Sequence, residues 1–136
     1  MTVRRIVVDH VLFVVSDLDA SRRLYTAALA PLGFAEMHVE ERGVHYGTDG
    51  MDDFAIYLGS PVTSAAHVAF SADGRQAVDG FLAAALANGA TMRGEPGVYT
   101  QYSERYHAAF VNDLQGNNVE AVWHAPAPVD APIRQR

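Results

Sequence analysis

Hydrophobic and polar positions follow two different periods along this chain, and each period occurs twice. Residues 6–15 are rich in Val and Ile, which is typical of a strand. The residues after this stretch show a spacing of 3, 1, 3 and 1, which lines one face of a helix; they are Ser21, Leu24, Tyr25, Ala28 and Leu29. A shorter strand pattern over 67–72 precedes an equivalent set, Val78, Phe81, Leu82, Ala85 and Leu86.

The two patterned stretches are copies of one another. Residues 10–34 align with residues 67–91 without gaps, at an offset of 57, and 8 of the 25 aligned positions are identical. The identities include the strand start, with His10 over His67, and an Ala-Ala-Leu-Ala run within the helix. Agreement in both the strand and the helix indicates an internal duplication rather than a shared alanine-rich composition.

Residues typical of helix ends flank each predicted helix. They are Ser16, Asp17 and Asp19 before the first helix, Pro31 and Gly33 after it, Asp73 and Gly74 before the second, and Asn88 and Gly89 after it. The pattern therefore predicts where both helices begin and end.

Short strand-like pieces follow each helix, so that each unit is predicted to be β-α-β-β-β. The pieces are 34–41, 43–47 and 53–58 in the first unit and 90–93, 106–112 and 118–124 in the second; Asp49-Gly50 and Gln115-Gly116-Asn117 are turns, and 94–105 is a long loop. We expect a single α+β domain over 1–136, with a first module at 6–60, a linker at 61–66, a second module at 67–124 and a loose surface tail at 125–136.

Composition narrows the possible functions. The net charge of −6 argues against nucleic acid as a partner, because phosphate requires a basic surface. No stretch reaches the roughly 20 apolar residues of a membrane span and no signal peptide is evident, so we expect a cytoplasmic protein without a membrane partner. The chain has no cysteine, and all ten of its basic residues are arginines. Thiolate and Schiff-base chemistry are thereby excluded, which leaves His, carboxylates, Tyr, Arg and a bound metal.

Three segments of the chain are the most informative: DHVLFVVSDLDASRRLYTAAL at the start, AHVAFSA at the second strand-helix junction, and YHAAFVNDLQGNNVEAVWH near the end. With them the sequence resembles, over about residues 6–124, the vicinal oxygen chelate superfamily, which includes glyoxalase I, bleomycin-resistance and fosfomycin-resistance proteins and extradiol dioxygenases. In the last segment, Leu114-Gln115 stands in place of the family's frequent Pro-Asp. The resemblance implies two β-α-β-β-β modules that form a curled, mixed eight-stranded half-barrel with helices on the outside, a metal at the floor of its cleft, and a homodimer.

The resemblance also implies a divalent-metal site. Three of the family's four ligand positions carry suitable residues, His10, His67 and Glu120, while the fourth falls at about Tyr57, where glyoxalase-type members have a carboxylate. This departure speaks against lactoylglutathione lyase activity and resembles the extradiol dioxygenase or fosfomycin-resistance arrangement. Two imidazoles and one carboxylate suit Fe, Mn, Ni or Zn, with open positions for substrate oxygens. The alternative role of each histidine alone is that of a hydrogen-bonded structural residue. The alternative for Glu120 is that its side chain faces solvent.

Further candidates lie near these positions. Glu120 and His107 are the candidate catalytic residues, with His107 as a proton shuttle; one of Tyr106 and His107 should face the cleft. Four residues are candidates for substrate binding: Tyr57, Tyr102, Tyr106 and His124. Packing roles are the alternative for all of them. His38 and His45 show no interpretable pattern.

Two classes of function compete. The first is a divalent-metal-dependent, glyoxalase-like or dioxygenase-like enzyme acting on a small oxygen-chelating substrate. The second is a metal-independent protein that sequesters a small molecule, as bleomycin-resistance proteins do. The three ligand-type residues favour the enzyme, whereas the acidic charge favours a cationic ligand and hence the second class. Transfer of a thiol to an epoxide antibiotic ranks last, because the chain lacks lysines that would hold an anionic phosphonate.

Overall fold

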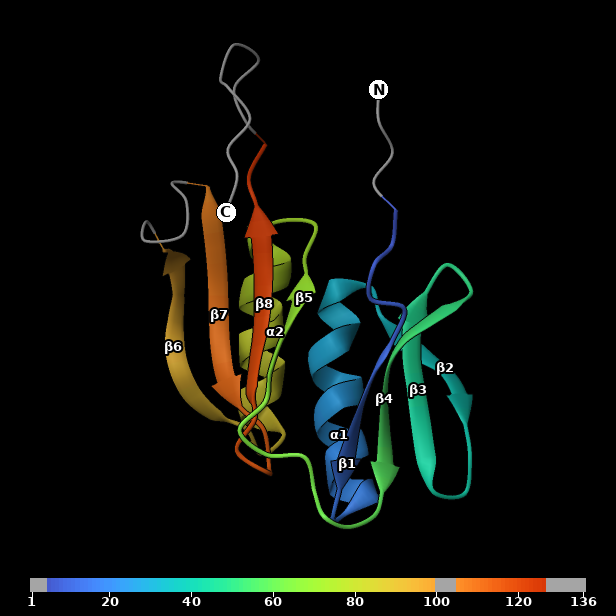
Figure 1. Cartoon of the computed structure of the whole chain (residues 1–136). Helices are drawn as coiled ribbons and strands as arrows, with labels where there is room; N and C mark the ends of the chain where they lie inside the picture. Colours follow the sequence, from blue (N-terminus) through green and yellow to red (C-terminus); the bar gives the residue numbers. More distant parts are fainter. Residues whose placement is uncertain (1–4, 100–104, 127–136) are drawn as a thin grey trace.

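The computed structural model describes residues 5–99 and 105–126 (Figure 1). The first half contains β1 (Val11–Val15), α1 (Leu18–Leu29), a short 3₁₀ helix η1 (Ala30–Leu32), β2 (Ala35–Val39), β3 (Gly43–Thr48) and β4 (Met51–Leu58). The second half contains β5 (His67–Ser71), α2 (Arg75–Ala87), β6 (Thr91–Val98), β7 (Tyr106–Asn112) and β8 (Asn118–His124).

Both helices begin, and α2 ends, where the sequence predicts, whereas α1 ends at Leu29 and η1 continues the chain to the predicted Gly33. Asp17 is the N-cap of α1, and its side chain accepts a hydrogen bond from the backbone N–H of Ala20 at 3.0 Å. After η1 the chain turns at Gly33, whose φ of 83° is left-handed and therefore favours glycine. Asn88 is the C-cap of α2. Neither helix of the described residues is long and apolar enough to cross a membrane.

The two halves have the same topology, which confirms the predicted pair of β-α-β-β-β units. The first four strands form a sheet in the order β1-β4-β3-β2, and the last four form a sheet in the order β5-β8-β7-β6. In each half the strand before the helix pairs in parallel with the last strand, and the other pairs are antiparallel. The hairpin between β3 and β4 turns at Asp49 and Gly50, which both have positive φ, as a two-residue type I′ turn requires.

Two predicted strand boundaries were wrong. Residues 6–10 are not part of a strand, because the parallel pairing with β4 starts at Val11 opposite Phe54. Residues 94–98, expected to be loop, continue β6 as far as Val98 opposite His107. Register shifts on both sides of Gly94 let this strand accommodate its two glycines, because bulges relax the regular ladder. The predicted tail lies mostly outside the described residues.

The eight strands do not form one curled half-barrel, so this part of the predicted architecture requires correction. They form two separate four-stranded sheets that are neither closed nor strongly curled, with β1 and β5 as their inner edge strands (Figure 1). Among the described residues, no ladder joins β1 to β5. The halves are held together through their helices instead, since α1 packs against α2 and α2 also contacts η1.

One hydrophobic core extends through both halves. Strand alternation directs Phe13 and Phe54 of the first sheet and Phe70 of the second into this core together with the helices. The rings of Phe54 and Phe70 meet edge to face, with their centroids 5.2 Å apart. The opposite face of each sheet is left to carry polar and functional side chains.

Candidate functional site

The open face of the second sheet holds a buried carboxylate. On β8, alternation sends Val119 and Ala121 into the core shared with the helices and Glu120 to the other face. Glu120 is 1% exposed even so, because β5 and β7 flank it and Phe110 lies opposite it in the register. A charged carboxylate at such a position is costly unless donors surround it.

Two donors reach the carboxylate. The Nε2 atom of His67, at the start of β5, lies 2.9 Å from Oε1 of Glu120. The hydroxyl of Tyr106, on β7, donates a hydrogen bond to Oε2. His67 is half exposed, with 52% of its side chain accessible, so the pair extends from the interior of the sheet to solvent. The structure thus brings together His67 and Glu120, two of the three predicted metal ligands.

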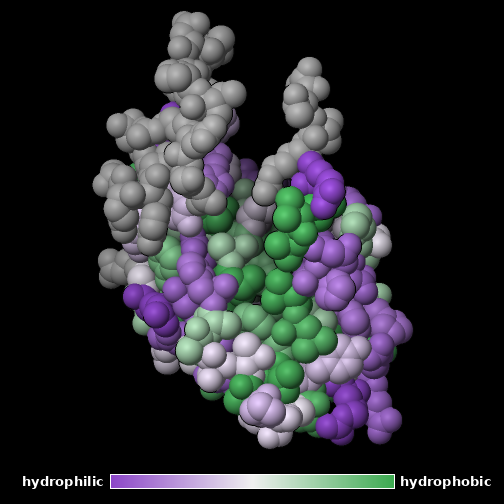
Figure 2. All heavy atoms as spheres, in the orientation of Figure 1, coloured by the Kyte–Doolittle hydropathy of each residue, from purple (hydrophilic) through white to green (hydrophobic). Residues whose placement is uncertain are grey.

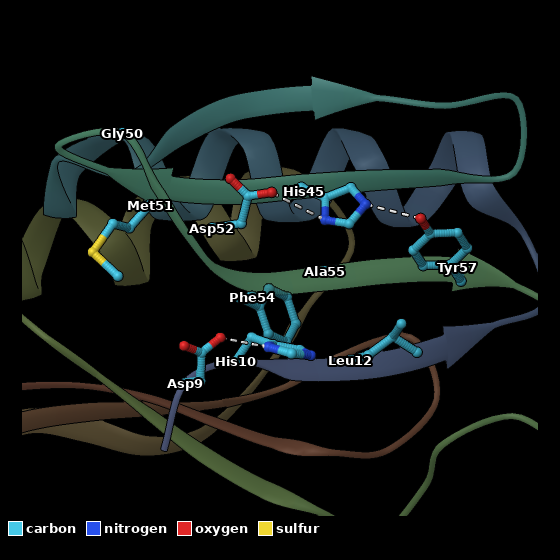
Figure 3. A pocket seen from close by; sticks show the side chains of 10 residues that line it. All are labelled: Asp9, His10, Leu12, His45, Gly50, Met51, Asp52, Phe54, Ala55 and Tyr57. Atoms are coloured by element: carbon cyan, nitrogen blue, oxygen red, sulfur yellow. Dashed lines mark hydrogen bonds and ion pairs between the residues drawn. The ribbon is translucent and has the colours of Figure 1, made fainter. Parts of the chain in front are cut away.

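The third predicted ligand, His10, lies on the other sheet. It directly precedes β1, its side chain is 66% exposed, and its Nδ1 atom lies 2.7 Å from Oδ1 of Asp9. His10 lines a cavity of the first sheet together with Leu12, His45 and Tyr57 (Figure 3). Within the described part of one chain, no three His, Asp or Glu side chains are grouped so that they could hold a metal ion.

The remaining predicted site residues are divided between two faces. His107 lies on the helix side of β7, with its Nε2 atom 3.7 Å from Oδ1 of Asp79 on α2, so the structure does not bring it to Glu120. His124 lies beside Tyr106, with ring centroids 5.0 Å apart, on the same face as Glu120. Tyr102 lies outside the described residues. Of Tyr106 and His107, it is therefore Tyr106 that faces the carboxylate.

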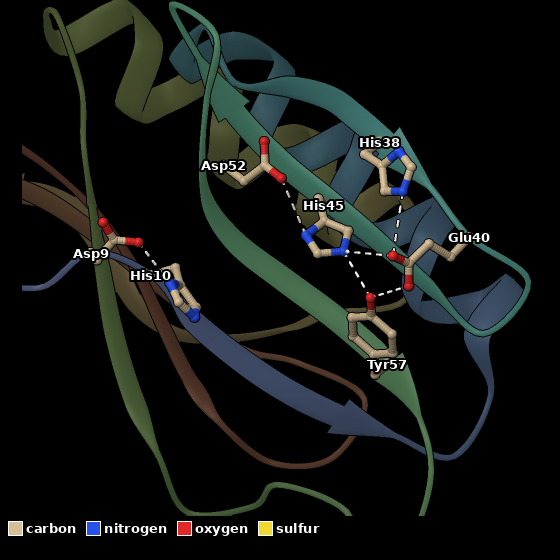
Figure 4. A network of polar contacts seen from close by, with 7 residues as sticks. All are labelled: Asp9, His10, His38, Glu40, His45, Asp52 and Tyr57. Carbon is tan, nitrogen blue, oxygen red and sulfur yellow. Dashed lines mark hydrogen bonds and ion pairs between the residues drawn. The ribbon is translucent and has the colours of Figure 1, made fainter.

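Sequence reasoning missed a polar network on the first sheet (Figure 4). The His45 imidazole is its centre: Nε2 lies 2.8 Å from the hydroxyl of Tyr57, and Nδ1 lies 3.4 Å from Oδ2 of Asp52. Tyr57 also donates to Glu40, which lowers the pKa of Glu40 and raises that of Tyr57. His38 joins through Glu40 Oε1 at 3.3 Å.

A strand-pairing argument could have found this network. His38 and His45 are register partners across β2 and β3, and such partners lie on the same face of a sheet. The turn between these strands lacks a glycine-containing turn signal. The sequence alone therefore did not reveal which residues of the two strands pair.

Comparisons with known proteins agree with this architecture. The family model described as the glyoxalase/bleomycin resistance protein/dioxygenase superfamily matches residues 7–121. The chain belongs to this superfamily, and the sequence-based recognition is confirmed. No curated protein matches the sequence.

Solved structures of the same superfamily are similar to the chain. A glyoxalase/bleomycin resistance protein from Albidiferax ferrireducens T118 shares 28% identity at a TM-score of 0.74, over 85% of this chain and 96% of that one. A glyoxalase-related enzyme from Fulvimarina pelagi shares 17% identity at a TM-score of 0.68, over 98% and 99%. A glyoxalase I mutant from Zea mays shares 20% identity at a TM-score of 0.65, over 85% of this chain but only 45% of the other.

Proposed function

We propose that the protein is a divalent-metal-dependent enzyme, of glyoxalase-like or dioxygenase-like type, that acts on a small substrate through adjacent oxygen atoms. The observation that carries the proposal is the contact between His67 Nε2 and the buried Glu120 carboxylate at 2.9 Å. An imidazole and a carboxylate held on rigid neighbouring strands are two donors of a common ligand set for Fe, Mn, Ni or Zn. Membership in the superfamily supports the same reading.

The neighbours of Glu120 suit a ligand role. Tyr106 occupies one carboxylate oxygen, so its hydroxyl would orient Glu120 while the other oxygen and His67 hold the ion. A bound ion would supply Lewis-acid polarisation of substrate oxygens. His124, beside Tyr106 on this face, would contact the substrate from the second sheet, and Tyr57 would contact it from the first.

We further propose that His10 completes the site from a second copy of the chain, in a homodimer. One core spans both halves and fixes the two sheets, so bringing His10 to His67 within one chain would require breaking that core. A second copy needs no such rearrangement. Among the described residues, no strand pairs with the inner edge of β1 or β5, although Val14 of β1 exchanges two hydrogen bonds with Thr63 of the linker. Ile6, Val7 and Leu12 are exposed hydrophobic side chains. Figure 2 shows apolar surface gathered between the two halves.

The proposal is tested by metal analysis of protein incubated with Mn(II), Fe(II), Ni(II) or Zn(II) and then desalted. We expect about one ion per chain in the wild type and almost none in Glu120→Ala, because a site of three ligands rarely survives the loss of one. His67→Ala, at a half-exposed position, should show the same loss with less risk to folding. Glu41→Ala removes an exposed glutamate and should retain full uptake.

A mixing experiment tests the placement of His10. His10→Ala and Glu120→Ala chains are each defective, but a heterodimer of the two would contain one intact site if ligands come from both chains. We therefore expect the mixed dimer to bind about one ion per two chains. No recovery in a verified heterodimer would place the whole site in one chain, and a protein that is monomeric at micromolar concentration would contradict the homodimer.

Failure of the wild type to take up any of these ions would favour the alternative function, metal-independent binding of a small molecule. The specific observation behind that alternative is the cavity of about 520 Å³ on the first sheet, a volume within the range of small-molecule sites.

A further inference from the structure

The hydroxyl of Tyr57 is held between two polar side chains on the open face of the first sheet (Figure 4). The Nε2 atom of His45 lies 2.8 Å from it, and the hydroxyl donates to Glu40. The rings of Tyr57 and His45 meet edge to face, with their centroids 5.5 Å apart. Tyr57 also lines the cavity that contains His10. Its hydroxyl is therefore held in place near a residue of the proposed metal site.

The backbone beside Tyr57 is adapted to its ring. Gly43 of β3 is the register partner of Tyr57 on β4. A Cβ atom at Gly43 would lie 2.6 Å from Cε1 of the Tyr57 ring, which is closer than real Cβ atoms approach a neighbour. Glycine is therefore required here while the ring keeps its place. The two polar partners and the close backbone hold the ring in one orientation, as a preorganised functional group requires.

His45 has the contacts of a residue that passes protons. Its other ring nitrogen, Nδ1, lies 3.4 Å from Oδ2 of Asp52, and its side chain is 22% exposed, so the ring can exchange protons with water. In a neutral imidazole one nitrogen donates and the other accepts, whereas the cation donates from both. His45 can therefore give a proton to the Tyr57 oxygen or take one from it, and Asp52 stabilises the cation.

Tyr57 keeps its proton at neutral pH. The hydrogen bond to Glu40 is the main cause that raises the pKa of Tyr57, and desolvation and the charge of Glu40 raise it further. The hydroxyl is thus a proton donor rather than a phenolate. A substrate that gains negative charge beside it would take this proton, and His45 could then replace it.

We propose that Tyr57 exchanges protons with the bound substrate, and that His45, oriented by Asp52, connects Tyr57 to solvent. In one direction the O–H bond of Tyr57 breaks and its proton bonds to a negatively charged substrate atom. The phenolate then takes the Nε2 proton of His45, which regains a proton from water; the reverse sequence removes a proton from the substrate. Tyr57 touches the substrate and is catalytic, whereas His45 and Asp52 act through it and are positioning residues. The inference rests on the proposed function, within which it favours a reaction that moves a substrate proton.

The test follows hydrogen exchange in hydroxyacetone, a small compound with two adjacent oxygens. Full-length protein is loaded with each ion that it retains and incubated with hydroxyacetone in D2O, and NMR measures the deuterium that replaces hydrogen on carbon. We expect saturable exchange by the wild type. Tyr57→Phe keeps the ring beside Gly43 and should lower kcat for exchange by about 100-fold, the size of an acid–base contribution, with KM and metal uptake unchanged.

Added imidazole distinguishes a proton route through His45 from a structural role. His45→Ala should lower kcat by about tenfold. Imidazole should restore most of this loss, relative to the wild type at the same imidazole concentration, because the cavity of about 520 Å³ admits it. His45→Gln keeps a donor to Tyr57 but cannot pass a proton, so it should be as slow as His45→Ala without imidazole. Glu41→Gln changes an exposed glutamate next to Glu40 and should leave exchange unchanged.

The outcomes separate this inference from the proposed function. No metal uptake by the wild type would overturn both. A metal-loaded wild type that exchanges no hydrogen would overturn the inference alone, as would a Tyr57→Phe or His45→Gln variant as fast as the wild type, or a His45→Ala variant that imidazole does not accelerate. Loss of metal uptake in Tyr57→Phe would also overturn it, because Tyr57 would then be a metal ligand.

Discussion

At the scale of single residues, the positions of greatest interest are polar groups buried by the packing around them. Glu120 is 1% exposed and is satisfied by His67 and Tyr106. Tyr25 is also 1% exposed, and its hydroxyl donates to Oδ2 of Asp113 at 2.5 Å, which ties α1 to the turn after β7. Asp113 in turn accepts from the backbone and side chain of Asn117. Buried polar groups of this kind specify a fold because the folded protein loses stability when one group of a pair is left without its partner.

The Tyr25 hydroxyl should make stability depend on alkaline pH. Burial, together with the nearby Asp113 carboxylate, raises the pKa of Tyr25 well above the ordinary value of 10.0, and burial raises the pKa of Tyr46 to about 12. The unfolded chain releases these protons near pH 10, whereas the folded chain retains them. The stabilisation is therefore complete below pH 10 and decreases as the pH rises towards the folded pKa values.

We predict that Tyr25→Phe lowers the free energy of unfolding at pH 7 by about 1 kcal/mol, because a buried hydrogen bond is lost. Above pH 10, the variant should lose stability less steeply than the wild type, by about 1.4 kcal/mol per pH unit. Urea denaturation at pH 7, 9, 10 and 11 measures both effects, with Tyr46→Phe as a second tyrosine variant. Parallel pH profiles for Tyr25→Phe and the wild type would contradict the assignment.

The same scale shows what the sequence reveals about the site. Alternation along 118–124 places Glu120 on the sheet face opposite to Val119 and Ala121. It does not indicate that Tyr106 rather than His107 meets Glu120, because that depends on which face of β7 packs on α2. The contribution of His45 was missed because its partners Asp52 and Tyr57 become neighbours only through strand pairing.

At the scale of elements, the two helices differ in how they begin. Asp17 caps α1 with its side chain, whereas the N-cap of α2 is Gly74, which makes no side-chain capping bond. Gly74 has an extended backbone, with φ and ψ both 178°, and a Cβ atom added there would meet no atom within 4 Å. Any residue can adopt this conformation, so a capping side chain should fit at Gly74.

We predict opposite effects of substitutions at these two caps. Asp17→Ala should destabilise the protein by about 1 kcal/mol, because a backbone donor in the first turn of α1 loses its acceptor. Gly74→Asp should stabilise it by roughly 0.5–1 kcal/mol, because a new acceptor faces the first turn of α2 and the unfolded chain becomes less flexible. Thermal unfolding followed by circular dichroism compares both variants with Gly74→Ala. Stabilisation by alanine equal to that by aspartate would show that capping is not the cause.

The sequence predicted whether each element is a helix or a strand. It predicted where an element ends only when residues close to that end determine it. Asp17 identified the start of α1, Gly33 the end of the helical segment that η1 continues, and Asn88 the end of α2; all three act within a few residues. The ends of β1 and β6 were not, because a strand extends only as far as its partner does. Glycines along β6 suggested a loop, although bulges against β7 accommodate them.

At the scale of the whole molecule, the internal repeat predicted two equal halves but not how they pack. The same pair of amphipathic helices and half-polar sheets could join by strand pairing between β1 and β5 or by helix packing. Here α1 packs against α2, and the open faces of both sheets remain available for ligands or a second copy. Local patterns cannot choose between these arrangements, since both bury the same helix faces.

The shared core makes a final prediction about cooperativity. Ile56, in the first half, is fully buried in the core that also contains Phe70 and Val119 of the second half. The chain has one tryptophan, Trp123, which lies in the second half and packs against the same core. We predict that Ile56→Val lowers the free energy of unfolding by about 1 kcal/mol and shifts the Trp123 fluorescence transition as far as the circular dichroism transition. Both probes then report one cooperative unit.

Glu41→Gln, an exposed substitution in the first half, should move neither transition. A dichroism shift without a fluorescence shift would show that the halves unfold separately, and would also remove the reason for assigning His10 to a second copy.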